Sequence, residues 1–185
     1  MTLKNLLGIS LDVVPADKGL VAKLLAAAQR NIADAQLAGL SAENRFDAAY
    51  KAIMQVAMVA LNANGYRTLT SKPGHHQTAI QTLQLSVGLP QAKVIVLDAL
   101  RKQRNLSDYS GDLIPDAAAA ECLASAQELL AHVRAWLQAK PLDAFRRRQQ
   151  AENFLPVGVR AGLPQLSDKL QQLARIHSQH PAADG

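Results

Sequence analysis

A polar run in the middle of the chain has the residue types that can hold a phosphate. It reads Arg101-Lys102-Gln103-Arg104-Asn105-Leu106-Ser107-Asp108-Tyr109. On a helix Arg101, Arg104 and Asp108 follow at steps of three and four residues, so they fall on or near one face, with Asn105 beside them. Guanidinium groups can grip a phosphate through two hydrogen bonds, and an amide or a phenol can orient it. The run therefore predicts a site for a phosphate or a nucleotide.

The same run is also compatible with an ordinary salt-bridged helix end. In that interpretation Arg104 pairs with Asp108, and Asp98 pairs with Arg101 or Lys102. Such surface ion pairs contribute little to stability. The residue types alone leave both interpretations open.

Two adjacent histidines, His75 and His76, offer acid–base chemistry. Imidazole titrates near neutrality, so it can accept and donate a proton during phosphodiester cleavage. Both stand at the start of a predicted helix, where unpaired backbone N–H groups attract anions. The alternative is that one histidine caps or packs the loop while the other is solvated. A metal site is not expected, because neighbouring side chains on a helix diverge by about 100° and no carboxylate lies close in sequence.

Further arginines add positive charge. Arg45 and Arg67 bracket a predicted helix and are expected near the same end of the bundle as the polar run. Arg146, Arg147 and Arg148 form a basic cluster that can contact a nucleic-acid backbone or be a solvated face. The formal net charge of +5 suits an acidic partner such as RNA, DNA or an acidic protein.

Composition favours a helical protein of one core. The 185 residues are 49% hydrophobic but only 4% aromatic, and alanine and leucine, which favour helices, dominate the apolar fraction. The single cysteine, Cys122, excludes an internal disulfide and a multi-cysteine metal site, and is expected to be buried. No glycine-rich phosphate loop, CxxC pair, nucleophile elbow or zinc-protease helix is present, which excludes several enzyme classes. The absence of a secretion signal and of a long apolar run predicts a cytoplasmic protein without membrane spans.

The helices that must position these residues follow from apolar spacing and from breakers. Val94, Leu97 and Leu100, with Ile95 beside them, form a stripe that should face the core just before the polar run. Asp17 and Ser41 are expected to open the first two helices as N-caps. Residues 1–16 are expected to be irregular and residues 66–74 to form a loop. The spacing predicts helices over 17–37, 41–62, 75–87, 91–108, 116–139 and 167–177.

Four long helices with modest connections predict an all-α, up-down helical bundle with one additional short helix. The bundle is expected to occupy residues 17–139. Residues 140–185 are expected to form a C-terminal extension that is irregular apart from one short helix.

Four blocks of the sequence together carry a family resemblance. They are Arg45-Phe46-Asp47-Ala48-Ala49-Tyr50-Lys51-Ala52-Ile53, Gly65-Tyr66-Arg67, Gly74-His75-His76 and Leu100-Arg101-Lys102-Gln103-Arg104-Asn105-Leu106-Ser107-Asp108-Tyr109. In their order on a helical bundle, over about residues 17–139, they resemble the HEPN superfamily (higher eukaryotes and prokaryotes nucleotide-binding domain). The resemblance implies a bundle that pairs with a second copy of itself. In RNA-cutting members an arginine and a histidine a few residues later form the signature, and two such motifs meet across the dimer. There the arginine binds the scissile phosphate, and the histidine activates the ribose hydroxyl or protonates the leaving oxygen.

The chain departs from the family pattern at one position. Arg104 and Asn105 match the start of the motif, but Tyr109 stands where the histidine is expected. Tyrosine titrates near 10 and is a poor general base at neutral pH. The departure weakens the expectation of the usual cleavage mechanism but not that of phosphate binding. Tyr109 can instead stack on a base, bond a phosphate or anchor the helix end, and some relatives carry a tyrosine near this motif that a partner nucleotidyltransferase modifies.

The leading hypothesis is an RNA-binding protein; endoribonuclease activity of the toxin–antitoxin or phage-defence kind is the further function that the resemblance leaves open. In it Arg104 holds the phosphate, Asn105 and Asp108 position it, and Tyr109 or the pair His75/His76 transfers protons or stacks. No metal or cofactor is expected, since a ribose 2′-hydroxyl can serve as the nucleophile. The hypothesis requires Arg104 and its counterpart in a second subunit to meet in a shared cleft. The alternatives are a non-catalytic dimeric bundle that contacts an antitoxin or a nucleotidyltransferase, and a bundle with a small-ligand pocket between its helices.

Overall fold

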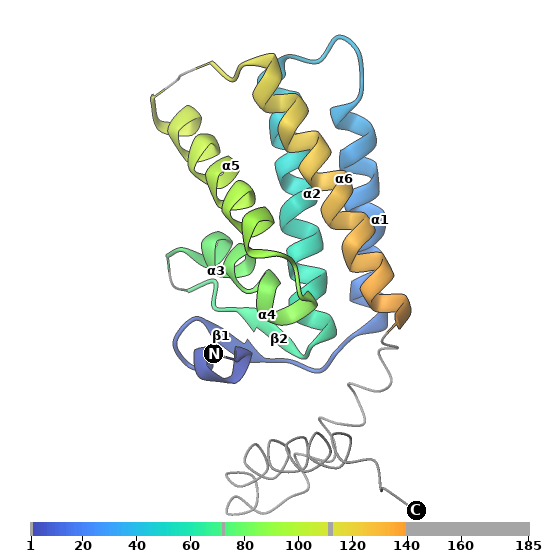
Figure 1. Ribbon diagram of the computed structural model, residues 1–185, viewed down its shortest axis with the longest axis vertical. Helices are drawn as coiled ribbons and strands as arrows, with labels where there is room; N and C mark the ends of the chain where they lie inside the picture. Colours follow the sequence, from blue (N-terminus) through green and yellow to red (C-terminus); the bar gives the residue numbers. More distant parts are fainter. Residues whose placement is uncertain (1, 72, 111–112, 140–185) are drawn as a thin grey trace, which may run out of the picture. The chain divides into compact units, whose positions relative to one another are not determined.

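The computed structural model describes residues 2–71, 73–110 and 113–139 (Figure 1). The predicted C-terminal extension, with its helix over 167–177 and Arg146–Arg148, lies outside the described residues. The elements, in order, are a short 3-10 helix (Leu3–Leu6), β1 (Leu11–Val13), α1 (Lys18–Ala35), α2 (Ala42–Ala63), β2 (Tyr66–Thr68), α3 (His75–Gln81), α4 (Leu83–Val87), α5 (Gln91–Ser110) and α6 (Asp116–Ala139). The prediction of an all-α helical bundle is confirmed.

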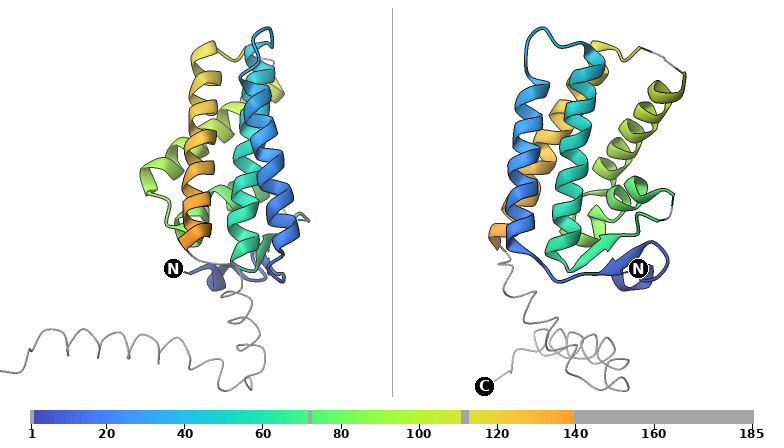
Figure 2. Two further views of the ribbon diagram at one scale, coloured as in Figure 1. Left: turned by 90° about the vertical axis from the view of Figure 1, so that its right-hand side faces the viewer. Right: turned by 180° about the vertical axis from the view of Figure 1, so that it is seen from behind.

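Helix α2 is the centre of the bundle. It packs against α1 and α6, which run alongside it in all three views of Figures 1 and 2, while α5 leans away at its far end. A helix that is apolar on most of its circumference is stable only when other elements cover it on several sides. The buried residues of α2 include Phe46, Tyr50, Ile53, Val56, Val59 and Leu61, together with the alanines at 49, 52, 57 and 60.

The predicted caps are present. The Asp17 side chain accepts hydrogen bonds from the backbone N–H groups of Gly19 and Leu20, and its own N–H donates to the Asn62 side-chain oxygen at 3.0 Å. This bond ties the start of α1 to the end of α2. Ser41 accepts from the backbone N–H of Asn44 at 3.3 Å and so opens α2. Each cap satisfies donors that a helix start leaves unpaired.

Two expectations about the connections were wrong. The irregular lead-in over 1–16 and the loop over 66–74 each contain a short strand, and β1 pairs with β2 antiparallel, Leu11 opposite Thr68 and Val13 opposite Tyr66. Three residues are too few for an alternating pattern to show in the sequence. The pairing is instead fixed by packing, since Leu11 is fully buried.

The helix expected over 75–87 is also two helices, α3 and α4, separated at Thr82. The Thr82 hydroxyl donates to the carbonyl oxygens of Thr78 and Ala79, at 2.9 and 3.0 Å. A hydroxyl that bonds back to the preceding turn competes with the regular ladder and bends a helix. The left-handed Gly88, at φ 68°, then ends α4.

The core follows the predicted stripes with one exception. Val94, Leu97 and Leu100 are buried on α5, but Ile95 is 61% exposed, one position off the stripe. Cys122 is fully buried on α6, and burial raises the pKa of its thiol to about 12. Within the described ranges, none of the helices combines the length and the apolar content that crossing a membrane demands.

Replacing Ile53 by alanine should lower the free energy of unfolding by about 2–5 kcal/mol, because it leaves a cavity where α2 is fully buried. Ile95→Ala removes the same atoms from an exposed position and should change the free energy of unfolding by less than about 0.5 kcal/mol. Urea unfolding followed by circular dichroism measures both. Equal losses for the two variants would contradict the central place of α2.

Candidate functional site

Side chains from three helices meet around Tyr50 of α2. The guanidinium carbon of Arg104, on α5, lies 5.3 Å from the ring centroid of Tyr50, on α2. The Tyr50 hydroxyl is 3.3 Å from Nδ1 of His76, on α3. The His76 ring lies edge-on to His75, with centroids 4.6 Å apart. We call Tyr50, His75, His76, Arg101 and Arg104 the Tyr50 cluster.

The local sequence explains why these residues converge. Leu97 and Leu100 hold one face of α5 on the bundle, and Arg101 and Arg104 continue that face where it turns polar. The left-handed conformation of Gly74, at φ 84°, turns the chain into α3, so both histidines stand in its first turn. The structure therefore brings together Arg101, Arg104, His75 and His76, four of the residues that the sequence singled out.

The arginines of the cluster have carboxylate partners. The Nε atom of Arg101 donates to Asp98 at 2.8 Å, and Lys102 also pairs with Asp98, at 3.1 Å. This part of the salt-bridge interpretation is confirmed. Arg104 donates through Nε to Asp47 on α2 at 3.1 Å; the Asp108 side chain lies outside the described residues.

Charge and burial set the protonation of the cluster. Partial burial raises the pKa of Asp98, but hydrogen bonds from Arg101 and Lys102 outweigh it and the net pKa lies below its usual value. Burial raises the pKa of Tyr50 to about 12, although Arg104 and Arg101 act against this. At neutral pH the phenol therefore keeps its proton.

His76 is held neutral by its surroundings. Partial burial lowers its pKa, and the nearby His75, Arg104 and Arg101 lower it further. A neutral imidazole has one donor nitrogen and one acceptor nitrogen. The positive charge of the cluster therefore comes from its arginines, and His76 supplies hydrogen bonding.

Other candidate residues lie elsewhere. Arg45 pairs with Asp116 at the start of α6, whereas Arg67 pairs with Asp12 across the two strands at 2.8 Å. They flank opposite ends of the 22-residue α2, about 30 Å apart along its axis, so the expectation that they share one end was wrong. Asn105 is exposed on α5. The side chains of Asp108 and Tyr109, like Arg146–Arg148, lie outside the described residues.

Tyr50 and Asp47 are the site residues that sequence reasoning missed. Both stand within a resemblance block, but Tyr50 is expected from its pattern only as a core aromatic. Its signal is a ring with a polar tip in the apolar stripe of the helix, since a buried tyrosine hydroxyl needs a hydrogen-bond partner. Asp47 has no such signal, because its role depends on where α5 passes.

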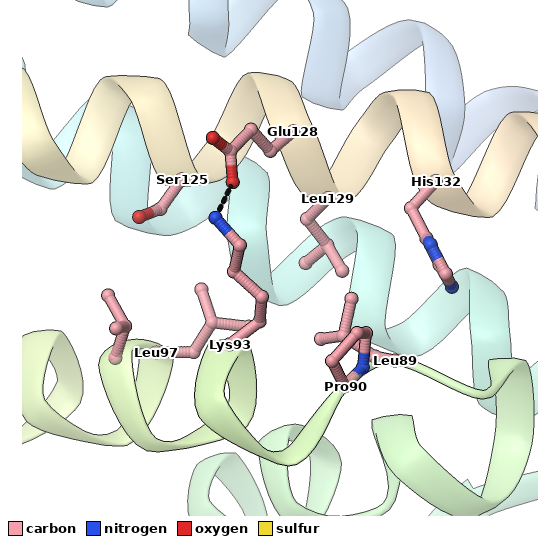
Figure 3. A pocket seen from close by; sticks show the side chains of 9 residues that line it. Leu89, Pro90, Lys93, Leu97, Ser125, Glu128, Leu129 and His132 are labelled. Atoms are coloured by element: carbon pink, nitrogen blue, oxygen red, sulfur yellow. Dashed lines mark hydrogen bonds and ion pairs between the residues drawn. The ribbon is translucent and has the colours of Figure 1, made fainter.

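Among the hollows of the described part, two have lining residues that can be compared with the Tyr50 cluster. A small one of about 20 Å³ beside Arg104 and Asp47 has room for one water molecule. A larger one of about 210 Å³ opens between α5 and α6 and is crossed by the Lys93–Glu128 ion pair at 2.5 Å (Figure 3). Its other lining residues are Leu89, Pro90, Val96, Leu97, Ser125, Leu129 and His132, so it shares none with the Tyr50 cluster. Within the described part, no group of three or more histidine, cysteine or acidic side chains is arranged to hold a metal ion.

Comparison with known proteins gives matches over a short segment. No family model and no solved structure matches the chain. A stretch of 53 residues, 29% of the chain, is 62% identical to a probable RNA methyltransferase of Pseudomonas aeruginosa strain PAO1. A probable RNA methyltransferase of Stutzerimonas stutzeri strain A1501 is 64% identical over 52 residues, and one of Dechloromonas aromatica strain RCB is 55% identical over 53. The chain spans about 15% of the length of these relatives.

The depressed pKa of His76 predicts a loss of stability in mild acid. Folded His76 takes up its proton at lower pH than the unfolded chain, whose histidine titrates near 6.5. Its contribution is therefore fully present above pH 6.5 and is lost as the pH falls through the folded pKa. Unfolding free energies of wild type and His76→Gln, measured between about pH 8 and about pH 5, should show a shallower decline for the variant. Identical slopes would mean that neither burial nor the neighbouring His75, Arg104 and Arg101 oppose the protonation of His76.

Proposed function

We propose that this protein is a HEPN-like helical bundle that binds RNA through the Tyr50 cluster. The observation that carries the proposal is the convergence of Arg101 and Arg104 with His76 over a buried tyrosine. These groups come from three of the sequence blocks on which the resemblance rests. Two guanidiniums and a neutral imidazole can surround a phosphodiester with donors without any metal ion.

The ion pair of Arg104 is compatible with phosphate binding. Asp47 is 53% exposed and Arg104 is 31% exposed, and an ion pair of this kind has little net stability in water. A phosphate that replaces Asp47 on Arg104 exchanges one anion for another. The released carboxylate then regains water.

RNA is the favoured polyanion. The relatives that share a segment with this chain are named as probable RNA methyltransferases, and the net charge of the whole chain is +5. Methyl transfer is not part of the proposal, because the chain spans only about 15% of those proteins. A cytoplasmic location belongs to the proposal as well, and so does pairing with a second copy, which the resemblance implies.

Replacing Arg104 by alanine should weaken the binding of fluorescein-labelled, mixed-sequence single-stranded RNA by about tenfold at low salt. The salt dependence of the binding constant should fall by about 0.7 in its log–log slope, as for the loss of one phosphate contact. Fluorescence anisotropy at several salt concentrations measures both quantities.

Arg134→Ala is the matched control. It removes the same charge from α6, where Arg134 donates to Gln29 of α1 at 2.7 Å. The control should bind RNA like wild type. Equal weakening by both variants would indicate nonspecific attraction, and no binding by wild type would favour a bundle that acts through protein contacts.

The same samples test for cleavage. RNA fragments with 2′,3′-cyclic phosphate ends, formed by wild type but not by His76→Gln, would establish a metal-independent endoribonuclease. Intact RNA that is bound in an Arg104-dependent way would identify a binding protein. Which ring nitrogen of His76 carries the proton affects whether the protein can cleave RNA or only bind it.

A further inference from the structure

Tyr50 touches both groups that can handle a phosphate. It is 2% exposed, and its ring lies under the Arg104 guanidinium while its hydroxyl reaches His76. A cation over an aromatic face is attracted by the ring. One buried side chain thus fixes an arginine of α5 and a histidine of α3.

We propose that Tyr50 is the positioning residue of this site: its hydroxyl donates to Nδ1 of His76, which places the ring proton on Nε2 and makes His76 a neutral donor to a phosphate oxygen. The direction of the hydrogen bond is argued from the described side chains and does not depend on a ligand. The bound phosphate, and its identity as part of RNA, rest on the proposed function.

The first step is the direction of the hydrogen bond. A buried O–H group needs an acceptor far more than a phenol oxygen needs a donor, because an unpaired buried donor loses its bond to water. Among the residues that the structure describes, Nδ1 of His76 is the one hydrogen-bond partner of the Tyr50 hydroxyl. If Nδ1 carried the proton, that hydroxyl would be left without an acceptor.

The second step is the protonation of the ring. Partial burial and the nearby His75, Arg104 and Arg101 disfavour a second proton on His76, and the Tyr50 that contacts it from α2 is uncharged. The Asp98 carboxylate is already shared by Arg101 and Lys102. A neutral ring that accepts at Nδ1 must carry its hydrogen on Nε2.

The consequence concerns the kind of ligand. An Nε2–H group donates to a phosphate oxygen, and a neutral donor suits an anion site already charged by arginines. Removing the proton of a ribose hydroxyl would instead require a lone pair on Nε2. The arrangement therefore favours holding the phosphodiester over cutting it.

The test reads the tautomer of His76 directly. Long-range 1H–15N spectra of the uniformly labelled full chain, at about pH 8 and without RNA, separate protonated from unprotonated ring nitrogens. His76→Gln identifies the signals of His76. In wild type, Nε2 should have the shift of a protonated nitrogen and Nδ1 that of an acceptor, and in Tyr50→Phe the two forms should mix.

Tyr66→Phe, which removes a hydroxyl outside the cluster, should leave the His76 signals unchanged. A wild-type His76 protonated at Nδ1, or signals unaffected by Tyr50→Phe, would overturn the proposal. The wild-type spectrum decides the direction of the bond even if Tyr50→Phe fails to fold.

RNA binding by the same variants separates the two proposals. Tyr50→Phe keeps the ring under Arg104 and should weaken the binding of mixed-sequence single-stranded RNA by about threefold, the effect of losing one positioning hydrogen bond. The expected tautomer without RNA binding would refute the proposed function and leave the role of Tyr50 standing. Arg104-dependent RNA binding by a protein whose His76 is protonated at Nδ1 would support the proposed function and refute the role of Tyr50.

Discussion

The burial of α2 is the constraint on which the rest of the structure depends. Five alanines of this helix are fully buried, and such small side chains let neighbouring helices approach closely; they are Ala49, Ala52, Ala57, Ala60 and Ala63. Its rotation is therefore fixed, since a turn by one residue would move the exposed Lys51 toward the core. With the rotation fixed, the side of α2 that faces α3 and α5 is fixed too. The position of the cluster is thus a consequence of packing that occurs elsewhere on the same helix.

The cluster combines buried neutral groups with partly exposed charges. Arg101 and Arg104 lie close enough to lower the pKa of His76, and each is balanced by a carboxylate, Asp98 and Asp47 respectively. Because each guanidinium has a carboxylate partner, both can lie beside the buried phenol of Tyr50 when no ligand is bound. A phosphate group is also an anion, so it can replace the Asp47 carboxylate as the partner of Arg104.

Local chemistry in the sequence predicts the helices and most of the site residues. The starts of α1 and α2 can be predicted from Asp17 and Ser41, because an N-cap side chain bonds the first turn of its own helix and does not depend on the surrounding fold. The strands, the break at Thr82 and the part played by Asp47 depend on which distant segments meet, and periodicity contains no such information. Tyr50 lies between these cases. Its polar tip is visible in the sequence, but its two partners become visible only when α3 and α5 are placed.

The site also determines how α5 is held. Among the described side chains, Leu100 is the last buried residue of α5, and Leu106 is 63% exposed. Beyond Leu100, Arg104 contacts α2 through its ion pair with Asp47 and through its position over Tyr50. The end of α5 that leans away from the bundle in Figure 1 is thus attached in part through the residues of the candidate site. Any anion that replaces Asp47 acts on this attachment, so ligand binding and the position of α5 are linked by the same two contacts.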